Sequence, residues 1–154
     1  MGFRILLVGL LVLLTGCGSV TEFFSKRPPE AGPTESIRPP QPELSVGSER
    51  IPFALGSYCW REGVKGICAD SIAPPDLLTF RQIPVMAVGP GAQMVVNFPA
   101  VPKEMSAAVH GGGGPLTVEG SKVTLPTAAG THIIILFARW DRGDGSYVFH
   151  VNVK

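Results

Sequence analysis

The sequence predicts an all-β domain, an immunoglobulin-like β-sandwich, over residues 51–154. Short apolar runs recur there at intervals of about ten residues, and Pro or Gly separates them, which favours a sandwich over alternating strand–helix units. The chain contains 15 Pro and 19 Gly residues, which mark turns and linkers. No long segment has helical periodicity. One helical turn is expected at Pro75-Asp76-Leu77-Leu78, where proline suits the first turn.

Two strands at the C-terminal end show the clearest pattern. We expect one strand from Thr131 to Trp140 and the next from Gly145 to Val153, with the turn residues Asp141-Arg142-Gly143-Asp144 between them. Side chains alternate between the faces of a strand, so one set in the last strand should face the core. That set is Tyr147, Phe149, Val151 and Val153.

Both faces of the first of these strands are apolar. We expect the face with Trp140 to point inward, because the other face ends in the charged Arg139. The inward set is then His132, Ile134, Leu136, Ala138 and Trp140. The other face presents Ile133, Ile135 and Phe137, a candidate partner surface that a loop, the linker or a partner protein could cover. Alternatively, the strand is central and is covered within the domain. Further strands are expected at Pro84–Val88, Gln93–Phe98, Met105–His110 and Lys122–Leu125.

The N-terminal segment, residues 1–16, has the pattern of an export signal. Arg4 precedes an apolar run from Ile5 to Leu14, which is too short to cross a bilayer because a spanning helix needs about 20 residues. The run ends in Leu14-Thr15-Gly16-Cys17, which resembles the lipobox of bacterial lipoproteins. An ordinary secretory signal with an incidental cysteine is the alternative.

The resemblance to lipoproteins implies that the Cys17 sulfur receives a diacylglyceryl group and that the chain is cut before it. Two or more acyl chains make a stable anchor, whereas one is marginal. The protein would then sit on the extracytoplasmic face of the cell membrane. In a cell with two membranes, Gly18 in place of Asp after Cys17 favours the outer membrane, by analogy with lipoprotein sorting.

Residues 17–50 are expected to be the lipidated cysteine and a disordered, proline-rich linker. Prolines are interspersed there with Glu, Ser, Arg and Gly, and such a stretch buries too little apolar surface to offset the entropy of ordering. The prolines favour extended polyproline II segments. A spacer is the expected role. Arg38-Pro39-Pro40-Gln41-Pro42 could alternatively be a ligand for a proline-reading domain.

Cys59 and Cys68 are expected to form a disulfide across a hairpin. A fold about Gly63-Val64, a type II′ turn signal, places the two cysteines directly opposite each other, within disulfide range. Glu62 and Lys65 would add a cross-strand ion pair. A structural staple is favoured, because a redox pair typically has the spacing Cys-x-x-Cys beside a βαβ unit.

The same region resembles a family of small uncharacterised exported proteins of Bacillus-type bacteria. The likeness lies in Gly56-Ser57-Tyr58-Cys59-Trp60, Cys68-Ala69-Asp70 and Pro74-Pro75-Asp76-Leu77-Leu78. It continues in Trp140, Gly143-Asp144 and Ser146-Tyr147-Val148-Phe149, and covers most of residues 51–154. The resemblance implies export and the cysteine pairing, and it implies no activity.

Several function classes are not expected. The 13 basic and 12 acidic residues nearly cancel and form no basic run, which argues against nucleic acid as a partner. His132 and His150 should lie on neighbouring strands but on opposite faces, and the Asp141–Asp144 loop is too short to hold calcium, so we expect no metal. The Gly111–Gly114 run lacks the lysine and context of a phosphate cradle, and no cofactor is expected.

No serine-hydrolase or zinc-protease motif is present, so we expect no enzyme and no catalytic residue. We expect instead a non-catalytic binding or structural module with a protein or cell-wall partner. The alternative is an inhibitor or regulator of an exported enzyme such as a protease, with the hairpin from Cys59 to Cys68 entering a cleft.

Overall fold

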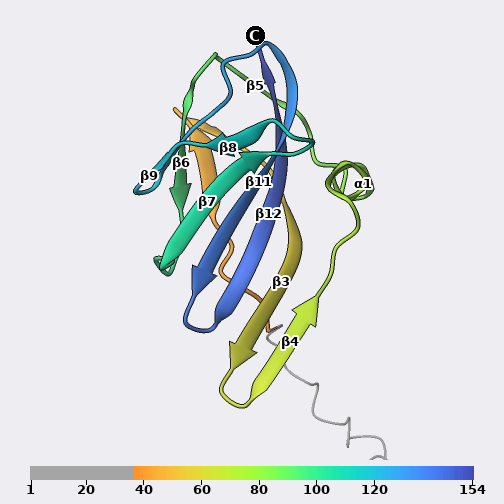
Figure 1. Ribbon diagram of the computed structural model, residues 1–154, viewed down its shortest axis with the longest axis vertical. Coiled ribbons are helices and arrows are strands. Elements are labelled where there is room, and N and C mark those ends of the chain that lie inside the picture. The colour runs from red at the N-terminus through yellow and green to blue at the C-terminus, as the bar shows by residue number, and fades with distance from the viewer. Residues whose placement is uncertain (1–36) are drawn as a thin grey trace, which may run out of the picture. The chain divides into compact units, whose positions relative to one another are not determined.

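A computed structural model describes residues 37–154 and has two antiparallel sheets packed face to face (Figure 1). The prediction of an all-β sandwich is confirmed. The five-stranded sheet has the order β2 (Glu49–Arg50), β1 (Glu43–Val46), β6 (Gln93–Asn97), β10 (Lys122–Thr124) and β9 (Val118–Glu119). The seven-stranded sheet has the order β4 (Lys65–Ala69), β3 (Ala54–Glu62), β12 (Gly143–Val153), β11 (Gly130–Trp140), β7 (Glu104–Val109) and β8 (Gly114–Leu116). β5 (Met86–Val88) lies parallel to the end of β12.

The core lies between the sheets and follows the predicted alternation. Tyr147, Phe149, Val151 and Val153 of β12 are buried, and so are Ile134, Leu136, Ala138 and Trp140 of β11. His132, predicted to face inward with them, is only half-buried at the end of β11. Leu44, Met94 and Val123 close the core from the five-stranded sheet. Burial of each such side chain contributes about 1.5–3 kcal/mol.

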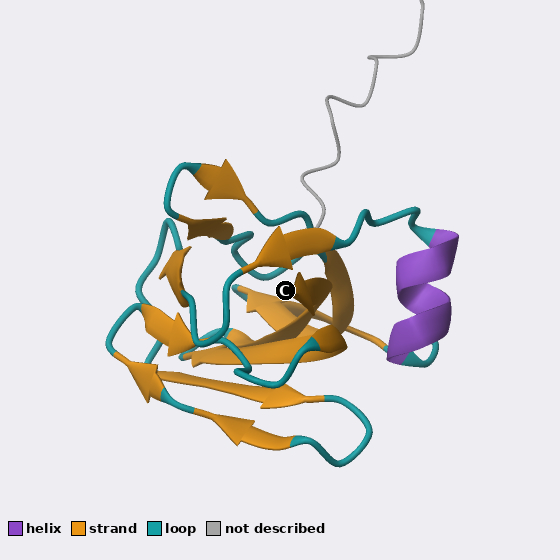
Figure 2. Ribbon diagram, turned by 90° about the horizontal axis from the view of Figure 1, so that it is seen from above, coloured by secondary structure: helices purple, strands orange, loops and turns teal. Residues whose placement is uncertain are grey.

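The helix α1 (Pro74–Phe80) covers part of the outer face of the seven-stranded sheet (Figure 2). It is longer than the single turn predicted, and Pro74 supplies its first position. Leu77 and Leu78 are buried against Ala54 and Val148, with Ile133 and Ile135 packed around them. The second interpretation of the apolar β11 face is therefore correct for these two isoleucines, because an element of the same domain covers them.

The sandwich begins before residue 51, which corrects the predicted linker boundary. Residues 43–46 form β1, which pairs with β6 from Glu43↔Asn97 to Val46↔Met94. The prolines of the preceding segment are also used within the domain, since Pro39 and Pro42 are buried. The ring of Pro39 lies beside Gly145, and the Tyr147 hydroxyl donates a hydrogen bond to the Pro40 carbonyl. The segment is thus part of the core wall and is not displayed as a ligand for another domain.

The remaining strands agree with expectation within a residue or two, with three additions. The strands predicted at 84–88, 93–98, 105–110 and 122–125 correspond to β5, β6, β7 and β10. β2, β8 and β9 were not predicted, because each has only two or three residues and β8 starts at the last glycine of the 111–114 run. The rest of that glycine run is a turn, as expected.

Candidate binding surface

The hairpin of β3 and β4 forms the edge of the seven-stranded sheet. Its register is the predicted one: Glu62 lies opposite Lys65, Trp60 opposite Ile67 and Cys59 opposite Cys68. Gly63 has a φ of 58°, as the first position of a type II′ turn requires. Cys59 and Cys68 form a disulfide with their Cα atoms 4.1 Å apart. The bond lies within one sheet, whereas the disulfide of antibody domains joins two sheets.

Arg142, in the β11–β12 turn, binds this hairpin through hydrogen bonds and an ion pair. Its Nε donates to the Arg61 carbonyl at 3.0 Å, and the Arg61 amide donates back to the Arg142 carbonyl at 2.8 Å. The guanidinium lies 5.4 Å from the centre of the Trp60 ring and pairs with the Glu62 carboxylate. The predicted Glu62–Lys65 ion pair is wrong, because the Glu62 carboxylate pairs instead with Arg142 of the β11–β12 turn.

Beneath Arg142 the aromatic side chains of the core form one connected cluster. Trp60 and Trp140 meet edge to face with ring centres 5.6 Å apart, and Phe98 contacts Trp140 at 5.0 Å. The Trp140 indole donates to the Ala100 carbonyl at 2.8 Å. Tyr147 continues the cluster, and burial raises the pKa of its phenol. At the hairpin end of the sandwich, the core therefore consists of the four contacting rings of Trp60, Phe98, Trp140 and Tyr147.

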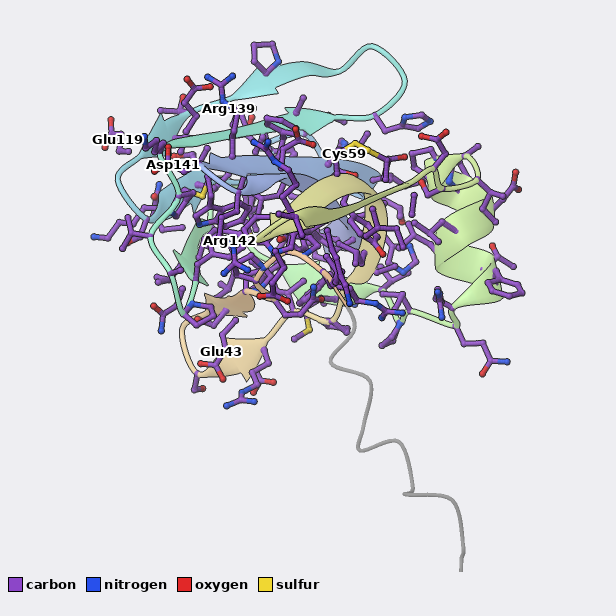
Figure 3. The ribbon with its side chains drawn as sticks, turned by 90° about the horizontal axis from the view of Figure 1, so that it is seen from below. Glu43, Cys59, Glu119, Arg139, Asp141 and Arg142 are labelled. Carbon is purple, nitrogen blue, oxygen red and sulfur yellow. A yellow bond between two sulfur atoms is a disulfide. The ribbon has the colours of Figure 1, made fainter. Side chains whose placement is uncertain are left out.

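A row of side chains crosses the outer face of the sheet at this end, and Figure 3 labels two of its members, Arg139 and Cys59. By register it runs Glu104, Arg139, Asp144, Cys59 and Cys68. Arg139 forms an ion pair with Glu104. Asp141, in the adjoining turn, pairs with Lys103. These ion pairs are exposed and link neighbouring segments of the sheet with little effect on stability. Across residues 37–154 no group of three or more metal-ligating side chains gathers that could hold an ion.

The candidate partner surface of β11 is divided by α1. Ile133 and Ile135 are half-buried against the helix, and Phe137 remains 37% exposed. The register places Ser106 on one side of Phe137 and Ser146 on the other. What remains open on this face is a single aromatic side chain between serines, bordered by the charged row.

His132 and His150 point away from each other, and each ring has its own hydrogen-bond partner. Ile133 is opposite His150 and His132 is opposite Val151, so the two rings point to opposite faces of the sheet. His132 Nε2 donates to the Ala128 carbonyl and His150 Nε2 to the Ile83 carbonyl, both at 2.8 Å. Both rings therefore have a structural hydrogen bond.

The surface of residues 37–154 has several hollows, two of which lie at β1 and at the disulfide. One, of about 620 Å³, opens between β1 and the segment before β5, with an Arg50–Glu43 ion pair of 3.2 Å at its rim. Its walls are mainly Leu44, Ile51, Phe53 and Met86. The other, of about 480 Å³, lies beside the disulfide and Arg142. Sequence reasoning did not find the first, because only the fold brings residues 42–44 and 50–53 beside the predicted strand at residues 84–88.

Cys17 and residues 1–16 lie outside the described residues. No helix between residues 37 and 154 is long and apolar enough to cross a bilayer.

The fold defines the class of this protein as a disulfide-bearing all-β sandwich. No family model, curated protein or solved structure matches the chain.

Proposed function

We propose that this protein is an extracytoplasmic lipoprotein that presents a non-catalytic β-sandwich as a binding or structural module. The observation that carries the proposal is the Leu14-Thr15-Gly16-Cys17 motif directly after an apolar run with a positive start. The disulfide supports export, because both cysteines are exposed to solvent and such bonds persist in oxidising compartments.

The sandwich would stand close to the membrane. Because Ile37 already packs against the core, at most residues 18–36 separate Cys17 from the sandwich. At roughly 3.1 Å per residue this spacer reaches at most about 60 Å. The module would therefore contact partners in the membrane-proximal layer of the envelope.

Mass spectrometry of the product from exporting cells tests the anchoring. The wild-type chain should begin at Cys17 with the added mass of acyl groups and should fractionate with membranes. Cys17→Ser should keep residues 1–16 and gain no lipid mass. The matched control Cys59→Ser/Cys68→Ser should remain lipidated, because those cysteines belong to the domain. An unmodified Cys17 in the wild-type chain would overturn the proposal.

The surface that would bind a protein or cell-wall partner is Phe137 with the flanking Ser106 and Ser146, called here the Phe137 strip. A photo-crosslinking amino acid in place of Phe137 should capture that partner on intact cells. Val95, on the five-stranded sheet, is equally exposed at 38% and serves as the matched control position. Equal capture at both positions would exclude the strip as a specific surface.

One observation favours the alternative, an inhibitor of an exported protease. Val64 at the hairpin tip is fully exposed while the disulfide holds the strands behind it. An inhibitor of this kind should slow exported proteases, and Val64→Asp should abolish the effect. Val101→Asp, at another highly exposed valine, should leave the inhibition unchanged. Proteolysis at the same rate with and without the protein would exclude this function.

A further inference from the structure

β4 is the longest unprotected edge strand among the described residues. It spans Lys65–Ala69 and pairs on one side only, with β3. The opposite edge strand, β8, is shorter and contains Pro115, which has no backbone N–H to offer. The edge strands of the other sheet, β2 and β9, have two residues each. Short strands and prolines commonly protect sheet edges, because an open edge pairs readily with a strand of another chain. β4 has no proline, and no element within residues 37–154 covers it (Figure 1).

The backbone groups of β4 are phased for pairing on the open side. In antiparallel strands the closely spaced residue pairs are those that exchange no hydrogen bonds. Cys59 and Cys68 are such a pair, with Cα atoms 4.1 Å apart. The N–H and C=O of Cys68, and by alternation those of Gly66, therefore point away from β3 toward solvent.

The side chains along this edge leave room for a second strand. On the outer face of β4 the chain presents only Gly66 and the disulfide sulfur of Cys68. On the other face Ile67, the central residue of the strand, is 46% exposed. The strand starts with the cationic Lys65 and is followed by the anionic Asp70.

We infer that β4 pairs antiparallel with β4 of a second copy of this chain. The register that overlaps the whole strand sets Ile67 against Ile67 of the second copy on the two-fold axis. Gly66 then lies opposite Cys68 of the second copy, and each such pair exchanges both backbone hydrogen bonds. Lys65 arrives beside the Ala69-Asp70 end of the other strand, so charges of opposite sign meet at both ends. A strand with the same charge at each end would lack this self-complementarity.

The β4–β4 interface is small, so we expect it to form only where copies of the chain are concentrated. One pair of short strands buries less than the roughly 1,200 Å² of a stable interface, so the pairing is weak in dilute solution. Copies confined to one membrane meet at a much higher effective concentration. In this respect the inference rests on the proposed function, and the experiment below reports the two separately.

Photo-crosslinking of the full chain in exporting cells tests the inference. With the crosslinking amino acid in place of Lys65, we expect a product of twice the chain mass whose crosslinked peptide contains β4 of the second copy. In place of Pro115, on the opposite edge, we expect no such product. An adduct with a different protein, no adduct, or equal yields from both positions would overturn the pairing. The mass of the Cys17 peptide in the same sample tests the anchoring independently.

Charged substitutions of Ile67, at the two-fold axis, distinguish pairing with a second copy from pairing with the strand of another protein. Ile67→Lys and Ile67→Glu each place like charges opposite each other, and each alone should lower the crosslink yield at least tenfold. Co-expression of the two should restore it, because opposite charges then face across the axis. Val64→Lys, outside the paired strand, should change nothing. An intact Cys59–Cys68 disulfide in every variant shows that the hairpin has formed. Failure of the mixture to restore the crosslink would refute self-pairing.

Discussion

Replacing Tyr147 with Phe isolates the hydroxyl that ties the segment before β1 to the core. The ring is fully buried between Phe53 and Phe98, and Phe fills the same volume, so packing is conserved. The loss is the hydrogen bond to the Pro40 carbonyl. A hydrogen bond of this kind contributes about 0.5–1.5 kcal/mol net. Tyr147→Phe should therefore lower the free energy of unfolding by about 1 kcal/mol and Tm by about 3–5 °C at neutral pH.

The effect of pH on this variant has a definite sign. Burial raises the pKa of Tyr147 above its ordinary value of 10.0, so above about pH 10 the unfolded chain releases the phenol proton first. The stability that Tyr147 contributes is complete below pH 10 and is lost as the pH rises beyond it, by about 1.4 kcal/mol per pH unit. Tyr147→Phe lacks this ionisation, and its deficit should vanish about one pH unit above 10.

Urea unfolding at pH 7 and in steps from pH 9.5 to 11 measures both effects. Tyr58→Phe is the matched control, because the Tyr58 hydroxyl makes no hydrogen bond within residues 37–154, and it should stay within about 0.5 kcal/mol of wild type. A Tyr147→Phe variant that loses nothing at pH 7, or whose deficit persists at pH 11, would refute the role assigned to this hydroxyl.

Three further variants and one control have expected outcomes. Cys59→Ala/Cys68→Ala should lower the free energy of unfolding by at most about 3 kcal/mol. If the variant and the oxidised wild-type chain unfold at the same urea concentration, the disulfide adds no stability. Arg142→Ala should cost about 1–2 kcal/mol because it removes the bond to Arg61 and the contact with Trp60, whereas Lys103→Ala, which breaks an exposed ion pair, should cost under about 0.5 kcal/mol in the same thermal unfolding. Gln82→Gly should stabilise by about 1 kcal/mol, because Gln82, just after the C-cap of α1, has a left-handed φ of 53° that glycine adopts without steric cost; a lower Tm would contradict this account.

The sequence predicted those features that depend on local order along the chain. The hairpin register follows from Gly63-Val64 and the spacing of the cysteines alone. The inward face of β12 follows from strict alternation over its last residues. Both are local patterns, so neither requires knowledge of which distant segment lies alongside.

The features that the sequence did not predict depend on distant partners. β1 has four residues and follows a run of prolines, and only its pairing with β6 and the burial of Leu44 make it a strand. The partner of Glu62 lies 80 residues away and arrives through the pairing of β3 with β12. Coverage of Ile133 and Ile135 by α1 likewise depends on a connection that no periodicity reveals.

The placement of β12 determines when this protein can acquire its structure. The last strand of the chain lies at the centre of its sheet, between β3 and β11, and contributes several of the most deeply buried side chains. A chain that still lacks these residues has no centre around which the earlier strands can pack. It therefore stays unfolded until β12 has been synthesised, and in the exported protein proposed above this late folding would keep the earlier strands extended for translocation.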